Sequence, residues 1–124
     1  MRLTPKADIN LTHLQNNFNY LRNICSGASV FPVIKADAYG HGLKPIVKSL
    51  ANSGADGFCV ALISEIEEVL SLMIDKPILH LGRITKEILE MTHVHKKVWC
   101  TVNSNVDLDL IDECFSDTGE IITV

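Results

Sequence analysis

The sequence predicts an α/β fold built on a parallel sheet. Short apolar runs alternate at a nearly regular interval with segments whose apolar residues recur every three or four positions. The runs are apolar along most of their length, which is typical of parallel strands covered by helices on both faces. Repeated strand–helix units with short connections form either a doubly wound sheet or a (β/α)8 barrel.

Five apolar runs are predicted strands. Glycine, proline and polar residues bound them, as expected where a strand ends. A complete barrel needs on the order of 250 residues, so 124 residues accommodate about five of its eight strands. In chain order the predicted strands are Val30–Ala36, Gly57–Leu62, Pro77–Leu81, Val98–Val102 and Glu120–Val124.

Helices are predicted before and between these strands. Thr12–Gln15 and Ser64–Glu67 have the form of capping boxes. Thr85 and Ser104 are single caps, and Gly54 suits the position just after a helix. The residues predicted to face inward are Leu14, Phe18, Leu21 and Cys25; Leu43, Ile46, Val47 and Leu50; Ile66, Val69, Leu70 and Met73; Ile88 and Leu89; and Leu108, Ile111 and Phe115.

Composition narrows the class of protein. The net charge is −4 and no basic cluster is present, which argues against nucleic acid or an anionic membrane as a partner. No run approaches the 18 or more apolar residues of a membrane span, and the N-terminus lacks the apolar core of a signal peptide. The four cysteines are widely spaced, and Cys59 and Cys100 lie in predicted strands. Free thiols in a reducing cytoplasm are therefore expected.

Several familiar site patterns are missing or weak. Gly40 and Gly42 lack the third glycine of a dinucleotide-binding turn, and there is no phosphate-loop Gly-Lys-Ser/Thr sequence. His93 and His95 form a pair without further ligands, so no metal site is expected. His80, in an apolar run, is expected to be a hydrogen-bonded core histidine.

Lys35 is the leading candidate for chemistry. It ends an apolar run, and a Gly-His-Gly turn follows within seven residues. A lysine at a strand end more often extends its ammonium group to solvent. In a water-poor setting, however, desolvation favours the neutral amine, which can form a Schiff base with a carbonyl such as a cofactor aldehyde.

The ten residues from Val33 to Gly42 separate these alternatives. The string Lys-Ala-Asp-Ala-Tyr-Gly-His-Gly, Lys35–Gly42, closely resembles the cofactor-lysine signature of the alanine racemases, fold-type III pyridoxal-phosphate enzymes with a barrel domain. The flanking strands and the opening Ala7–Leu11 also resemble this family, the latter its first short strand. The resemblance favours a partial (β/α)8 TIM-type barrel over a doubly wound sheet.

The resemblance implies roles for three residues. Lys35 corresponds to the lysine that binds pyridoxal 5'-phosphate as a Schiff base and acts as base on one face of the substrate Cα. Tyr39 corresponds to a tyrosine that hydrogen-bonds the cofactor phosphate, and Leu81 to an apolar residue of the cofactor pocket. The implied reaction interconverts L-alanine and D-alanine, which supplies D-alanine for peptidoglycan.

The resemblance also indicates what these 124 residues lack. The family's second base is a tyrosine of a C-terminal β domain, supplied by the partner subunit of a homodimer. Tyr20 and Tyr39 are the only tyrosines, and neither matches it. Residues 1–124 are therefore expected to be the N-terminal part of the barrel domain, inactive alone. Two alternatives stay open: a non-catalytic pyridoxal-phosphate carrier, and a truncated gene product without function.

Overall fold

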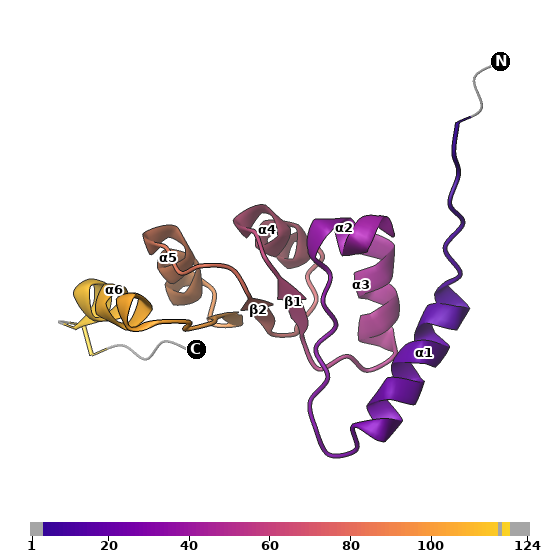
Figure 1. The fold of residues 1–124 in the computed structure, drawn as a ribbon, viewed down its shortest axis with the longest axis horizontal. Coiled ribbons are helices and arrows are strands. Elements are labelled where there is room, and N and C mark those ends of the chain that lie inside the picture. Colours follow the sequence, from indigo (N-terminus) through magenta and orange to yellow (C-terminus); the bar gives the residue numbers. More distant parts are fainter. Residues whose placement is uncertain (1–3, 117, 120–124) are drawn as a thin grey trace.

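Three parallel strands and six helices make up the described part of the chain, residues 4–116, 118 and 119 of the computed structural model. Figure 1 shows α1 at one end of the long axis of the molecule and α6 at the other, with the other helices and the sheet between them. The helices are α1 (Leu11–Ile24), α2 (Lys35–Gly40), α3 (Leu43–Asn52), α4 (Ile63–Ser71), α5 (Lys86–Val94) and α6 (Asn105–Phe115). The strands are β1 (Phe58–Val60), β2 (Ile78–His80) and β3 (Val98–Cys100).

The sheet has the order β1-β2-β3, and both pairings are parallel. Residues 30–34 lie beside β1 as a further extended segment, joined to it by a parallel bridge between Val33 and Cys59. Ile34 N donates to Cys59 O at 2.9 Å, and Cys59 N donates to Pro32 O at 2.9 Å. The predicted α/β fold with a parallel sheet is confirmed. The predicted run Glu120–Val124 lies outside the described residues.

The first predicted strand is shorter than expected. Val30–Ala36 was predicted to be extended throughout, but the extended conformation ends at Ile34 and α2 begins at Lys35. The apolar pattern could not show this end, because Ala36 suits a strand and a turn equally well.

The sheet is curved, as a contact between two aromatic rings demonstrates. The Phe31 and Trp99 rings lie with their centroids 5.8 Å apart. Phe31 belongs to segment 30–34 and Trp99 to β3, with β1 and β2 between them. Three strand spacings in a flat sheet would separate their backbones by about 14 Å. The two side chains meet because the sheet bends toward the face that carries them.

Buried helix residues and strand residues form one core. The α3 residues predicted to face inward, Leu43, Ile46, Val47 and Leu50, are all buried, and Gly54 follows the C-cap of that helix with φ +93°. The inward positions Ile66 and Val69 of α4 and Ile88 and Leu89 of α5 are also buried. Cys59 and Cys100 are buried in strands as thiols outside any disulfide, as predicted.

Four residues predicted to face inward do not. Met73 is 87% exposed, because α4 ends at Ser71 and Met73 takes a left-handed conformation with φ +56° beyond its end. Leu21 and Cys25 of the α1 segment are exposed, since only Phe18 of that helix is buried against the core. Leu108 is exposed because Leu110 and Ile111 carry the inner side of α6.

Two predicted helix starts are also corrected. Helix α1 begins at Leu11 and is capped by Asn10, whose Oδ1 accepts from His13 N at 3.0 Å, so Thr12 is not the cap. Ala7–Leu11 forms no strand, since residues 4–10 are irregular. Helix α4 begins at Ile63, before Ser64. The caps predicted at Thr85 and Ser104 are confirmed.

A substitution at Gly57 tests the curvature. A Cβ at this buried glycine would overlap the Phe31 ring, so we expect Gly57→Ala to push that ring away from Trp99. We expect the free energy of unfolding to fall by about 1–3 kcal/mol, as for other overpacked sites. Urea unfolding followed by the emission of Trp99, the single tryptophan, measures both effects. In a Phe31→Ala background the same substitution should cost little, and an equal cost there would contradict this packing.

Candidate active site at the strand ends

The sequence-predicted site residues lie where strands end. In a parallel sheet the carboxyl ends of all strands meet at one edge. Lys35 directly follows segment 30–34, and Leu81 directly follows β2, where its N–H donates to Val60 O at 2.8 Å. Lys35 and Leu81 are therefore at the same edge, with the end of β1 between them. Open α/β sheets and barrels use this edge for ligands.

Lys35 stands at the start of an unusual turn. Its side chain is half-buried, and the preceding Ile34 is almost fully buried. The next four residues, Ala36–Tyr39, all have left-handed conformations, with φ between 52° and 57°. Such conformations cost roughly 1–2 kcal/mol per residue outside glycine. Backbone strain of this kind persists only where surrounding contacts impose it, and it gathers at functional sites.

Asp37 holds the far end of this turn. Its Oδ1 accepts from Leu43 N, the first residue of α3, at 2.7 Å, and its carbonyl accepts from Gly42 N at 3.0 Å. His41 Nδ1 lies 2.9 Å from Ala38 O. Asp37 thus ties the turn to the start of α3. Tyr39, which the turn carries next to these groups, keeps its side chain 60% exposed.

Glu65 holds the near end of the turn. Its Oε1 accepts from Ala36 N at 2.7 Å, and its Oε2 accepts from Ala61 N and Leu62 N at 2.8 and 3.0 Å. Burial by itself would raise the pKa of Glu65, but these three hydrogen bonds outweigh it and lower the pKa. The carboxylate therefore links the backbone after Lys35 to the end of β1.

The sequence predicted only a part of this role. Glu65 lies in the first turn of α4, within the predicted capping box Ser64–Glu67, and that local pattern indicates only an acidic helix start. Its bond to Ala36, 29 residues earlier, depends on two strand ends meeting in space. A glutamate at the third helix position after an apolar strand was the available signal.

His80, the last residue of β2, contacts the loop that follows β1 at the same edge. It is buried in β2, and its Nε2 lies 3.0 Å from Ala61 O, while Nδ1 has no partner among the described residues. Burial lowers the pKa of His80, although Ala61 and Glu65 oppose this shift. The expected hydrogen-bonded core histidine is confirmed. A Cβ at Gly82 would lie 2.7 Å from Ala61 O, so the backbone passes this point too closely for a side chain.

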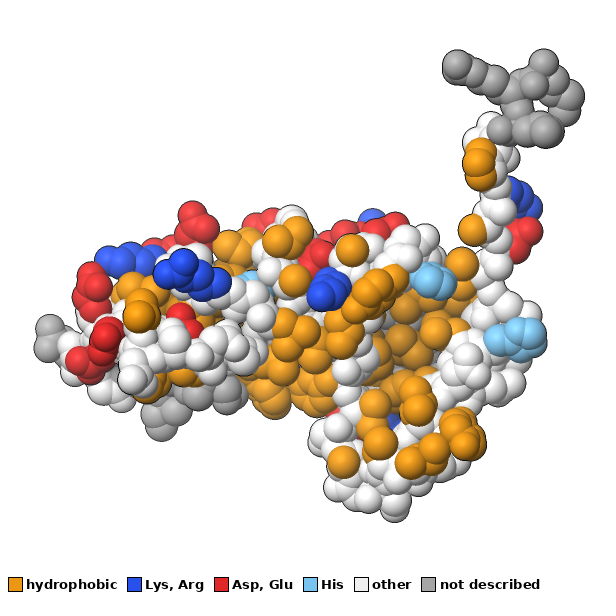
Figure 2. Space-filling view, viewed as in Figure 1, with side chains coloured by type: hydrophobic (Ala, Val, Ile, Leu, Met, Phe, Trp, Pro, Cys, Tyr) orange, Lys and Arg blue, Asp and Glu red, His pale blue; other side chains and the backbone are white. Residues whose placement is uncertain are grey.

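An apolar groove of about 470 Å³ opens beside the turn, between α1 and segment 30–34. Figure 2 shows hydrophobic side chains gathered on this part of the surface, with a histidine next to them. Tyr39 and His41 of the turn line the groove together with Val33, Phe18 and Leu21. One side of Tyr39 therefore faces the apolar surface of this groove.

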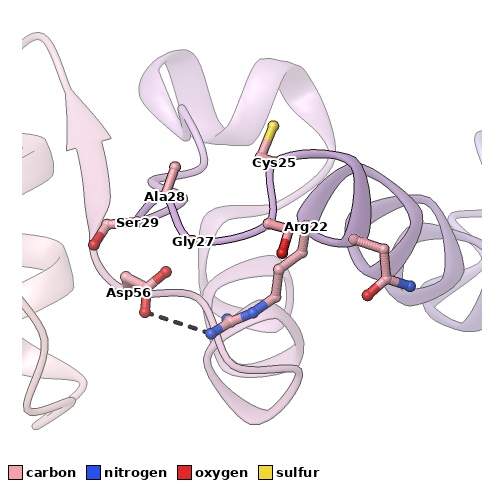
Figure 3. A pocket seen from close by; sticks show the side chains of 8 residues that line it. Arg22, Cys25, Gly27, Ala28, Ser29 and Asp56 are labelled. Atoms are coloured by element: carbon pink, nitrogen blue, oxygen red, sulfur yellow. Dashed lines mark ion pairs between the residues drawn. The ribbon is translucent and has the colours of Figure 1, made fainter.

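A polar hollow of about 430 Å³ lies at the opposite edge of the sheet, near the end of α1. Figure 3 shows Arg22 and Asp56 facing each other across it, with Nη2 and Oδ1 3.6 Å apart. Asp56 also accepts from Val30 N at 2.8 Å. These contacts join α1 to the beginnings of two extended segments, so this hollow belongs to the scaffold.

The remaining histidines form no ligand set. His93 packs against the Phe115 ring, with centroids 6.2 Å apart. Across residues 4–116, 118 and 119, no three His, Cys, Asp or Glu side chains are arranged to hold a metal ion. Within the same residues, no helix is long and apolar enough to cross a membrane.

Comparison with known proteins identifies the family. The family model described as "Alanine racemase, N-terminal domain" matches residues 9–124. The chain belongs to this family. Alanine racemase from Carboxydothermus hydrogenoformans is 38% identical over 84 residues, which are 68% of this chain and 23% of that protein. Alanine racemase from Clostridium tetani is 39% identical over 84 residues, 68% of this chain and 22% of that protein.

Solved alanine racemases share the fold. The structure from Clostridium difficile 630 in complex with cycloserine matches with a TM-score of 0.77 and 35% identity, over 92% of this chain and 30% of that chain. The structure from Bartonella henselae, with covalently bound pyridoxal phosphate, matches with a TM-score of 0.81 over 90% of this chain and 31% of that chain. Its identity is 21%, so it bears on the fold alone. The chain spans less than a quarter of the length of its alanine racemase relatives by sequence.

The lowered pKa of His80 predicts a pH-dependent stability. The unfolded chain takes up a proton on this histidine near pH 6.5, and the folded chain does so only at lower pH. The free energy of unfolding should therefore decrease as pH falls below about 6.5, by at most about 1.4 kcal/mol per pH unit. Urea unfolding at pH 7.5, 6.5 and 5.5 measures it.

Two variants show whether His80 causes this pH dependence of the free energy of unfolding. His80→Gln keeps a donor for Ala61 O and should flatten the dependence between pH 6.5 and 5.5. His13→Gln, at an exposed position of α1, should leave it unchanged. The lowered pKa of Glu65 does not interfere, because its contribution is lost only at pH values below about 4.5. If the free energy of unfolding of His80→Gln still falls as steeply with pH, another group causes the pH dependence.

Proposed function

We propose that this chain carries the cofactor-binding lysine of an alanine racemase, with Lys35 as the amine that binds pyridoxal 5'-phosphate covalently. Tyr39 would donate a hydrogen bond to the cofactor phosphate, and Leu81 would contact the ring. The observation that carries the proposal is the position of Lys35, half-buried and directly after a strand, at the edge that Leu81 shares. Membership of the alanine racemase family supports the choice of reaction.

The residues present fit this cofactor by their chemistry. Lys35 supplies an amine for an aldehyde, the exposed Tyr39 supplies a hydroxyl for a phosphate, and Leu81, 39% exposed, supplies an apolar surface. The rigid turn after Lys35 holds the first two in a fixed relation, because Glu65 fastens its first residue, Ala36, and Asp37 ties it to the first residue of α3. When bound, pyridoxal phosphate withdraws electrons from the substrate, so that the Cα proton becomes acidic.

Lys35 would move that proton. A racemase must remove the proton from one face of Cα and return a proton to the other, so it needs a group on each face. The Lys35 amine can serve one face. Tyr20 is exposed on α1, and Tyr39 is assigned to the phosphate, so we assign the second base to a part of the enzyme outside these 124 residues.

The proposal extends to architecture and setting. We assign residues 1–124 to the N-terminal part of a (β/α)8 barrel domain. The parallel order of segment 30–34, β1, β2 and β3 supports it, as does the curvature that brings Phe31 to Trp99. A homodimer acting on alanine in the cytoplasm completes the proposal, and the reduced thiols of Cys59 and Cys100 suit a reducing compartment.

Covalent capture tests the role of Lys35. The purified chain is incubated with pyridoxal phosphate and treated with borohydride: Lys35 Nζ attacks the aldehyde carbon, water leaves, and hydride reduces the resulting C=N bond to a stable amine. We expect peptide mapping by mass spectrometry to find one label per chain, on Lys35. Lys35→Ala should lose the label, while Lys44→Ala, at an exposed position of α3, should keep it. Equal labelling of all lysines would refute the assignment.

Racemisation itself is a separate measurement. The chain is incubated with pyridoxal phosphate and L-alanine, and D-alanine is determined by chiral chromatography. Because the second base is assigned elsewhere, we expect no more D-alanine than in a cofactor-only blank. Formation well above that blank would show that these residues contain both bases.

A further inference from the structure

The Glu65 side chain joins the backbone next to Lys35 to a neighbouring strand end. Its Oε1 accepts from Ala36 N at 2.7 Å, and its Oε2 accepts from Ala61 N and Leu62 N. The carboxylate is buried, with 8% of the residue exposed. Three charge-assisted hydrogen bonds on one carboxylate form a short and rigid connection.

This connection begins where the chain changes direction. Ala36, whose N–H the carboxylate holds, is the first of the four left-handed residues. A residue other than glycine adopts this conformation only when contacts impose it. Glu65 fastens the turn at Ala36, and Asp37 fastens it at Leu43. The direction of the backbone leaving Lys35 is therefore set at Ala36.

The same connection reaches the neighbouring strand. Ala61 follows β1, its N–H donates to Glu65, and its carbonyl lies 3.0 Å from His80 Nε2. His80 is the last residue of β2, and Leu81 comes next. A continuous series of hydrogen bonds thus runs from the residue after Lys35, through Glu65 and Ala61, to the residue before Leu81.

We infer that Glu65 is the positioning residue of Lys35: by holding Ala36 N–H against the ends of β1 and β2, it aims the lysine amine at the cofactor aldehyde. The inference rests on the proposed role of Lys35 and adds a residue to it. Glu65 touches neither cofactor nor substrate in this proposal. It acts through the backbone of the turn.

The substitution Glu65→Gln tests the inference. Glutamine has nearly the same size, but its amide nitrogen can only donate, so it cannot accept on both sides as the carboxylate does. Glu67→Gln is the matched control, because Glu67 carries the same charge on the same helix and is exposed. A third variant combines Glu65→Gln with Ala36→Gly, since glycine adopts a left-handed conformation without strain.

Amide hydrogen exchange without cofactor is the first measurement. We expect exchange at Ala36 to quicken about tenfold or more in Glu65→Gln, the size expected when a hydrogen bond to a charged group is lost. Exchange in β1 should stay as in Glu67→Gln, whereas a general loss of structure would quicken it everywhere. Unchanged exchange at Ala36 would overturn the inference.

Capture of pyridoxal phosphate at Lys35 is the second measurement. We expect Glu65→Gln to lower the rate of borohydride-trapped labelling at Lys35 about tenfold relative to Glu67→Gln, with Lys44 unlabelled in both variants. Adding Ala36→Gly should restore part of the rate, because it removes the strain that Glu65 compensates. A packing defect would not be relieved in this way.

The two measurements separate this inference from the proposed function. If the unaltered chain is labelled at Lys35 and Glu65→Gln is labelled equally fast, the inference fails and the proposed function stands. If the unaltered chain is not labelled at Lys35, the proposed function fails, because the lysine does not react with the cofactor aldehyde. The inference then falls with it, even where exchange at Ala36 responds.

If Glu65→Gln does not fold, an acid titration of the unaltered chain tests the inference instead. The amide proton resonances of Ala36 and Ala61 should then shift together in an acid titration, because one carboxylate accepts from both. Independent shifts would overturn the inference.

Discussion

The candidate site depends on the buried carboxylate of Glu65, which accepts hydrogen bonds from three backbone N–H groups. These bonds connect the turn after Lys35 to the end of β1. Parallel strands bring their ends to one edge, but they leave the N–H groups of the following loops without ladder partners. Glu65 satisfies such groups in two loops at once, at Ala36 and at Ala61 and Leu62. An anion suits this position because each of its oxygens accepts strongly and burial strengthens the bonds.

The left-handed turn shows why that connection is needed. Four consecutive residues in this conformation cost several kcal/mol together, at roughly 1–2 kcal/mol each. The contacts that oppose this strain include the bond from Ala36 N to Glu65, the bond from Leu43 N to Asp37, and the bond from Ala38 N to Ile34 O. Strain held in this way makes the turn stiff, and stiffness is what a lysine needs if its amine must meet an aldehyde in one geometry.

The two edges of the sheet differ in chemistry. At the carboxyl edge lie Lys35, Leu81 and the buried pair Glu65 and His80. At the amino edge the Arg22–Asp56 pair lies in a polar hollow and fastens α1 to the extended segments. In barrel enzymes one end carries the chemistry and the other end contributes stability, so the proposed assignment to a barrel domain would account for this division.

Local pattern was sufficient for the parallel α/β class, for the positions of β1, β2 and β3, for the inward face of α3 and for the caps at Thr85 and Ser104. Each of these depends on nearby residues and on periodicity. Lys35, the proposed cofactor lysine, was indicated by the resemblance of Lys35–Gly42 to a known signature. Other features came only from contacts distant in sequence: the left-handed turn, the reach of Glu65 to Ala36, and the curvature that joins Phe31 to Trp99. Periodicity cannot reveal them, because they arise only when separate strand ends and faces meet in space.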